Sequence, residues 1–215
     1  MAYSPALARR LRLGLIGDGA GPLDTHQLGA ASAFRTLPDG EIVRQVPGGG
    51  AGTVTSAALT RILPNHRHAL VFDAQLAPGG ETTADTLAEA TLWLLNQGVD
   101  MVLFCLGTEH TNPALNASLE RCHSVGVSLL AGVTSTWPAS HTAVLGVAAQ
   151  PHQHGGLHWV GGDACSVLHG ETADPAAAIG DVASLALSGV AKGLSADALA
   201  DHVRAACQRT ERRAG

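Results

Sequence analysis

Cysteines, histidines and isolated acids are the residues of this chain that could do chemistry. A cysteine attacks a substrate only as its thiolate, which needs a neighbouring base or another source of stabilisation. The cysteines here are widely spaced, form no CxxC pair and have no base beside them in the sequence. We interpret them as buried thiols in a reducing cytoplasm, with Cys105 and the Cys165-Ser166 pair as the alternative nucleophiles. The four cysteines are Cys105, Cys122, Cys165 and Cys207.

A histidine-rich stretch at residues 151–158 (PHQHGGLH) could supply metal ligands. A zinc site needs several such ligands held in a fixed geometry. Nothing in this glycine-bearing stretch predicts a rigid element, so we expect a surface loop and no metal. The residues that could contribute to such a site are His152, His154, His158, Asp163, Cys165 and His169.

A glycine-rich turn at residues 17–21 (GDGAG) follows a short apolar run, as a nucleotide-binding turn does. Its spacing is not GxGxxG, and proline and aspartate follow where a phosphate-binding helix would begin. We therefore expect no dinucleotide cofactor, and no other cofactor is implied.

Composition predicts one domain, residues 1–215, that can bury a single core. Apolar residues make up 46% of the chain and charged residues 14%, and the net charge is -5. No run of basic residues forms a face for nucleic acid, and no apolar run is long enough to span a membrane. We expect a cytoplasmic protein that binds neither nucleic acid nor membrane.

Short apolar runs that are typical of buried strands alternate with longer helical segments. Repeated strand–helix–strand units predict an α/β fold, with a parallel sheet and helices on both of its faces. In such sheets ligands bind beyond the carboxyl ends of the strands. The expected strands are 11–16, 69–74, 101–105, 127–131 and 144–148. The expected helices are 54–63, 82–97, 112–122, 175–187 and a last one that ends at 207.

Residues 96–107 (NQGVDMVLFCLG) carry the most informative pattern. They resemble the passage of subtilisin-like serine proteases in which a helix ends in NNGVD and a buried strand ends in SLG. The resemblance covers residues 11 to 207 and implies a subtilisin-like three-layer sandwich, the peptidase S8 fold. Further segments follow in the family's order: 13–19 (LGLIGDG, similar to VAVIDSG), 24–28 (DTHQL, to HPDL), 50–54 (GAGTV, to HGTHVAG), 129–133 (LLAGV, to AAAGN), 137–147 (WPASHTAVLGV, to YPASYPNVIAVGA) and 169–175 (HGETADP, to GTSMASP).

The resemblance also places the family's catalytic residues, and all four are replaced. Gly17 stands at the aspartate and Ala51 at the histidine. Val133 stands at the oxyanion-hole asparagine, and Glu171 at the nucleophilic serine. Because base, carboxylate and oxyanion donor work as a unit, we expect a pseudoprotease that does not hydrolyse peptides and is not an enzyme.

Two acids near these positions leave alternatives open. Asp18 is one residue past the aspartate position, where strand alternation would turn it to the opposite face, although a bulge at the strand end could redirect it. Glu171 could bind a basic peptide group or act as a base, but we expect it to be a solvated residue of a first helical turn.

In the family, two strand ends pair with an extended peptide substrate, and the residue types here remain compatible with that. Strand addition draws affinity from backbone groups and specificity from side-chain pockets. The alternative is that these strand ends persist only because the sheet must end somewhere. The expected peptide-binding residues are Cys105, Leu106, Gly107, Ala131, Gly132 and Val133.

Three functions remain open at the level of sequence. The first is a binding module that holds a peptide or protein partner during maturation; some short subtilases mature peptides, and one similar family matures quinohemoprotein amine dehydrogenase. The second is a peptidase or hydrolase with a relocated site. The third is a structural subunit that pairs with an active protease homologue. Residues available to a relocated site are Asp18, His26, Glu171 and Cys165.

Overall fold

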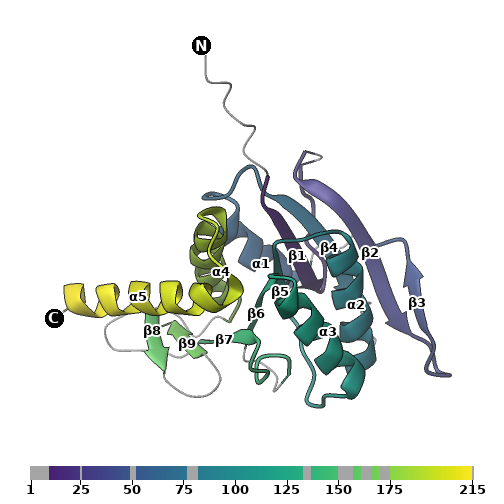
Figure 1. The fold of residues 1–215 in the computed structure, drawn as a ribbon. Helices are drawn as coiled ribbons and strands as arrows, with labels where there is room; N and C mark the ends of the chain where they lie inside the picture. The colour runs from purple at the N-terminus through teal and green to yellow at the C-terminus, as the bar shows by residue number, and fades with distance from the viewer. Residues whose placement is uncertain are drawn as a thin grey trace, which may run out of the picture.

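The computed structural model describes residues 10–24, 26–48, 52–76, 82–132, 137–149, 157–160, 166–169 and 175–214. In this part of the chain the strands form one nine-stranded sheet, with helices packed on both of its faces (Figure 1). The strands are β1 (Arg12–Gly17), β2 (Leu28–Thr36), β3 (Ile42–Gln45), β4 (Leu70–Leu76), β5 (Met101–Phe104), β6 (Ser128–Gly132), β7 (Val144–Ala149), β8 (Leu157–Val160) and β9 (Ser166–His169). The helices are α1 (Thr53–Ile62), α2 (Ala84–Asn96), α3 (Pro113–Ser124), α4 (Pro175–Ala191) and α5 (Ala196–Ala214).

The sheet order is β3-β2-β4-β1-β5-β6-β7-β9-β8. Every pairing from β2 across to β9 is parallel, and the outermost strands β3 and β8 pair antiparallel. The predicted α/β fold with a parallel sheet is therefore confirmed. The strands expected from apolar runs correspond to β1, β4, β5, β6 and β7, with ends that differ by one or two residues.

Alternate residues of each parallel strand feed two cores, one on each face of the sheet. Leu13, Leu15 and Leu103 face α1, α4 and α5, whereas Ile16 and Phe104 face α2 and α3. Full burial of each large aliphatic side chain contributes about 1.5–3 kcal/mol. Burial in these two cores therefore holds the helices in place more than helix propensity does.

Local signals set the helix ends. Thr83 caps α2 and forms a reciprocal capping box with Thr86, and the Asn112 side chain accepts the Leu115 N–H at the start of α3. Gly98 follows α2 with φ at +66°, the left-handed conformation expected after a helix end. None of the described helices combines the length and the apolar character needed to cross a bilayer.

The strands β2, β3, β8 and β9 are not among those expected from the sequence. β2 (LGAASAFRT) is made mainly of small residues with weak strand propensity, and only its second half alternates between buried and more exposed positions. β3 and β8 are four-residue strands at the ends of the sheet, so neither carries the continuous apolar run of a central parallel strand.

Candidate functional site

Gly17, which the resemblance to subtilisin-like proteases places at a catalytic aspartate, has no room for a side chain. Gly17 ends β1 beneath the first turn of α1, and a Cβ added to it would overlap Thr55 Oγ1 and lie 3.1 Å from Cβ of Cys105. Thr55 is fully buried, and the exposed fraction of Cys105 is 4%. The place where a carboxylate would stand is therefore filled by a hydroxyl from α1 and a thiol from the end of β5.

Asp18 acts as the cap of α1. Its carboxylate accepts the N–H of Val54 at 3.3 Å, the N–H of Thr55 at 3.1 Å and the Thr55 hydroxyl at 2.7 Å. The backbone N–H of Asp18 donates back to Thr55 Oγ1 at 3.2 Å. The residue before α1, Gly52, has no side chain to cap the helix, so Asp18 supplies one from the end of β1.

The direction of the Asp18 side chain differs from what strand alternation predicts. Asp18 contacts Thr55, the same residue that a side chain on Gly17 would meet, so both positions face α1. β1 ends at Gly17, and the chain turns there instead of continuing its pleat. Burial alone would raise the pKa of Asp18, but the hydrogen bonds from Thr55 and Val54 together lower it below its ordinary value.

A second acid, Asp73 on β4, lies beside this cluster and behaves in the opposite way. Only 3% of it is exposed. Oδ2 accepts the Ala20 N–H at 3.0 Å and the Gln75 amide at 2.8 Å, and Oδ1 has no hydrogen-bond partner among the described residues. Burial raises the pKa of Asp73, its two hydrogen bonds lower it in part, and the nearby charge of Asp18 raises it further. Sequence analysis missed Asp73, although an acid inside the apolar run LVFDAQL is itself a signal.

Cys105 is a poor nucleophile in this setting. Burial raises the pKa of its thiol to about 12, the Thr55 hydroxyl lowers it only in part, and the charges of Asp18 and Asp73 raise it further. Among the described residues, no histidine is hydrogen-bonded to Cys105 or to Thr55. Within the described part of the chain, this cluster therefore contains no histidine that could accept a proton from Cys105 or Thr55.

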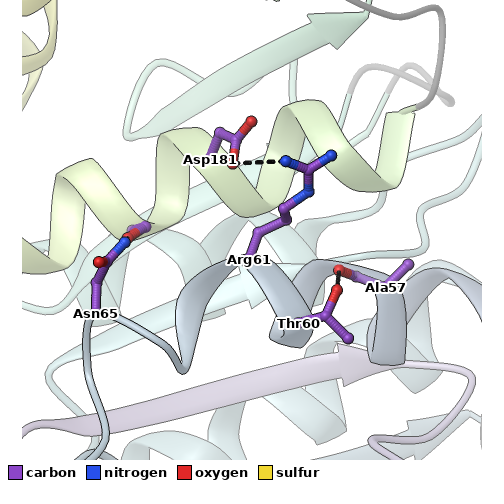
Figure 2. A network of polar contacts seen from close by, with 6 residues as sticks. Ala57, Thr60, Arg61, Asn65 and Asp181 are labelled. Atoms are coloured by element: carbon purple, nitrogen blue, oxygen red, sulfur yellow. Dashed lines mark hydrogen bonds and ion pairs between the residues drawn. The ribbon is translucent and has the colours of Figure 1, made fainter.

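The helices α1 and α4 lie side by side and run in the same direction. Arg61 contacts Asp181 at 4.0 Å, and one turn further along Asn65 donates to Ser184 at 3.2 Å (Figure 2). A Cβ on Gly180 would lie 2.8 Å from the carbonyl oxygen of Ala58, so glycine permits this close approach. Because the two helices are parallel, their N-termini meet at the carboxyl edge of the sheet.

The strand ends expected to bind peptide lie at this same edge. Cys105 N–H donates to Ile16 at 2.8 Å, and Thr108 exchanges two hydrogen bonds with Trp137, at 2.9 and 3.0 Å. Between these points, Leu106 and Gly107 are partly exposed and form no backbone hydrogen bond within the described residues. Among the described residues, nothing is hydrogen-bonded to this two-residue stretch of backbone.

The other expected groove wall is more enclosed. Ala131 is fully buried on the α2–α3 face, and Gly132 pairs with Val147 of β7. A Cβ on Gly132 would meet Ile179 of α4 at 3.5 Å, an ordinary contact. Three positions assigned by resemblance, Ala51, Val133 and Glu171, fall outside the described residues.

Of the residues considered for a relocated site, the structure describes Asp18 and His26, and it does not bring these two together. Asp18 lies just past the carboxyl end of β1, whereas the His26 carbonyl accepts a hydrogen bond from Arg10, before the start of that strand. The six residues of β1 separate these ends by roughly 20 Å. Cys165 also lies outside the described residues, as do Asp163 and both His152 and His154. Among residues the structure does describe, no group of three His, Cys, Asp or Glu could hold a metal ion.

Comparisons with known proteins rest on structure alone. No protein-family model matches the chain, and no curated protein matches its sequence. The prenylagaramide maturation protease PagA matches with TM-score 0.57 and 16% identity, over 86% of this chain and 78% of its own. A lanthipeptide protease matches with TM-score 0.63 and 11% identity, over 89% and 78%. A cold-adapted subtilisin-like serine proteinase matches with TM-score 0.59 and 13% identity, over 93% and 83%. The chain therefore shares its fold with subtilisin-like serine proteases.

Proposed function

We propose that this protein is a non-catalytic, subtilisin-like binding protein, a pseudoprotease that holds an extended peptide or a partner protein during maturation. The observation that carries the proposal is that Thr55 and Cys105 occupy the space that a side chain at Gly17 would need. The family's mechanism needs a carboxylate there to orient the catalytic imidazole. Here the position holds a Thr55 hydroxyl that is already committed to Asp18.

The neighbouring acids and thiol do not replace the missing chemistry. Asp18 directs its carboxylate at the N-terminus of α1, where three hydrogen bonds converge on it. Cys105 stays protonated near neutral pH because burial raises the pKa of its thiol to about 12. A buried thiol without a base does not attack an amide.

The open backbone at Leu106 and Gly107 supports the binding part of the proposal. An extended peptide can add to such a strand end through its main chain, without needing any catalytic side chain. We take Cys105, Leu106 and Gly107 as one wall of this groove. Ala131, Gly132 and Val133 form the other.

The maturation context comes from the structural neighbours. One is named a prenylagaramide maturation protease and another a lanthipeptide protease, so both names connect this fold with peptide products. Function does not follow from fold, so the context stays a proposal. The partner would be a peptide awaiting maturation or an active protease homologue. Cys105 and Cys122 are buried and form no disulfide among the described residues, which supports a cytoplasmic location.

Activity profiling tests the non-catalytic part. Purified protein is incubated with a fluorophosphonate probe and, separately, with an unstructured peptide library. We expect neither labelling nor cleavage. Labelling or cleavage that disappears on substitution of a groove hydroxyl or thiol would establish the alternative, a peptidase or other hydrolase with relocated catalytic residues.

Backbone pairing tests the groove. Peptides recovered from the library on immobilised protein are titrated into labelled protein, and amide chemical shifts are followed by NMR. We expect shifts at Leu106 and Gly107, and loss of binding when the peptide is N-methylated at alternate residues. Gly107→Pro removes one donor from the groove, and Gly48→Pro, at an exposed glycine with open space around it, is the matched control. Equal binding by both variants would remove the groove.

A further inference from the structure

A cavity lies at the amino edge of the sheet, at the opposite end of the parallel strands from Gly17. It has a volume of about 750 Å³ and lies between the start of β1, the loop after α1 and the C-terminal end of α4. The Asn65 amide and the His66 ring both bond Ser184 of α4, at 3.2 and 2.8 Å, which fixes the loop against that helix. Figure 2 shows Asn65 at the end of this α1–α4 contact, where the cavity begins.

The charged lining of this cavity is basic, in a chain whose net charge is -5. Arg10 and Arg67 both line it, and neither forms an ion pair with an acid among the described residues. His66 and His68 add two imidazole rings to the lining. The single acid in the lining, Asp100, accepts the backbone N–H of Arg12 at 2.9 Å.

Arg10 is held in place before any ligand arrives. Its Nε donates to the His68 carbonyl at 2.8 Å and one terminal nitrogen donates to the His26 carbonyl at 2.6 Å. A guanidinium fixed in this way loses little conformational entropy when it binds an anion. Its remaining donors are suited to a carboxylate.

Part of the cavity lining is apolar, formed by Leu11, Ala69, Val190 and Ala191. A small inorganic anion would leave these apolar residues uncovered, whereas a peptide with an apolar side chain next to a carboxylate would cover both kinds of surface. We infer that this cavity binds an acidic peptide segment through Arg10 and Arg67, with an apolar side chain of the peptide seated on Leu11 and Val190. This site is separate from the proposed groove.

Fluorescence anisotropy with a defined probe tests the inference. The probe is a fluorescein-labelled hexapeptide, glutamate-leucine-glutamate-glutamate-leucine-glutamate, and its partner has glutamine in place of every glutamate. We expect saturable binding of the acidic peptide that weakens with salt, and affinity at least about tenfold lower for the glutamine peptide. No saturable binding, or equal affinity for the two peptides, would overturn the inference.

Variants then place the peptide on the molecule. Arg67→Glu combined with His68→Glu reverses the charge of one exposed side chain and adds a negative charge at another, whereas Arg10 is left intact because it also holds two carbonyls. Arg44→Glu, at an exposed residue of β3, is the matched control. We expect the double variant to weaken binding at least about tenfold and Arg44→Glu to change it less than about twofold. Equal losses would show non-specific attraction and overturn the site.

Two further arms distinguish this site from the groove and from a site for simple anions. Gly107→Pro is expected to leave the affinity for the acidic peptide unchanged, and a loss there would assign the peptide to the groove instead. Sodium acetate is added at an ionic strength matched with sodium chloride. Displacement by acetate well beyond the chloride effect would indicate a simple anion site and overturn the peptide assignment. An unchanged near-ultraviolet circular dichroism spectrum checks that each variant is folded.

Discussion

The carboxyl and amino edges of the parallel sheet differ in how their polar and charged side chains are partnered. At the carboxyl end, Asp18, Thr55 and Cys105 fill the space above Gly17 and satisfy one another. At the amino end, Arg10 and Arg67 line an open cavity without an acidic partner among the described residues. Ligands of such folds ordinarily bind at the carboxyl end. Among the described residues of this chain, the side chains at the carboxyl end contact one another, and the two arginines without an acidic partner lie at the other end.

Helix direction explains why an acid suits one end and a base the other. α1 and α4 are parallel to each other, with positive N-terminal ends at the carboxyl edge and negative C-terminal ends at the amino edge. The Asp18 carboxylate complements the N-terminus of α1 directly. If this difference between the two ends is real, substitutions at the carboxyl edge should cost stability, whereas substitutions at the amino edge should cost binding alone.

The largest effect is expected from Gly17→Asp, which restores the family residue. The new side chain would overlap Thr55 and press on Cys105, and it would bring a third acid next to Asp18 and Asp73. Overpacking of a core costs about 1–3 kcal/mol, and a buried, poorly paired charge adds to this, so we expect a loss of at least about 3 kcal/mol and no peptidase activity. Urea denaturation measures the loss.

Gly48→Asp is the control for Gly17→Asp, because nothing lies within 4 Å of a Cβ added at Gly48. We expect it to change the free energy of unfolding by less than about 0.5 kcal/mol. If Gly17→Asp were as stable as this control, the space above Gly17 would be open, and the main support for a non-catalytic function would be lost.

The next effect in size is expected from Asp18→Ala. Removing the cap leaves the N–H groups of Val54 and Thr55 without their acceptor, and loss of a helix cap costs about 1–2 kcal/mol. Asp24→Ala, at an exposed acid outside any cap, is the control. The folded state lowers the pKa of Asp18, so its stabilisation is present above the unfolded pKa and is lost as pH falls through the folded pKa. The difference between Asp18→Ala and the parent protein should therefore shrink below about pH 4.

A smaller effect of opposite sign is expected from Asp73→Asn. The folded state raises the pKa of Asp73. The stability of the parent protein relative to Asp73→Asn is therefore greatest below the unfolded pKa of about 4, and this advantage is lost as pH rises through the folded pKa. Asparagine does not titrate and can still accept the Ala20 N–H. Relative to the parent, the variant should gain stability as pH rises from about 4 to about 7, measured by urea denaturation across that range. If the free energies of unfolding of variant and parent differed by the same amount across this pH range, Asp73 would have an ordinary pKa.

The sequence predicted the central strands because they are continuous apolar runs, and it placed α2 and its terminal Gly98 correctly. The side-chain contacts at the carboxyl edge were harder to predict from the sequence. The replacement of the family aspartate by Gly17 was visible, but the filling of its space by Thr55 depends on how α1 packs on β1, and Thr55 is 37 positions from Asp18 in the sequence. The pleat rule failed at Asp18 because it holds only inside a strand.

The cavity at the amino edge could not be predicted from the sequence. Arg10, His66 and Arg67 come from segments more than fifty residues apart, and Val190 comes from the far end of the chain. No periodicity links such positions, because loops after a helix and before a strand carry no regular pattern. Tertiary contacts bring these segments together: Arg10 bonds the His68 carbonyl, and Asn65 and His66 bond Ser184.

The smallest effect on stability is expected from Arg67→Glu, and it tests the open end of the sheet. Arg67 is exposed, forms no ion pair among the described residues and accepts only one weak hydrogen bond, at its backbone carbonyl. The free energy of unfolding should change by less than about 0.5 kcal/mol, as for an ordinary surface position. Urea denaturation at low and at high salt gives the value. A loss above about 1 kcal/mol that salt reduces would mean that Arg67 already stabilises the fold electrostatically. The amino edge would then be as internally satisfied as the carboxyl edge, and the difference between the two ends would disappear.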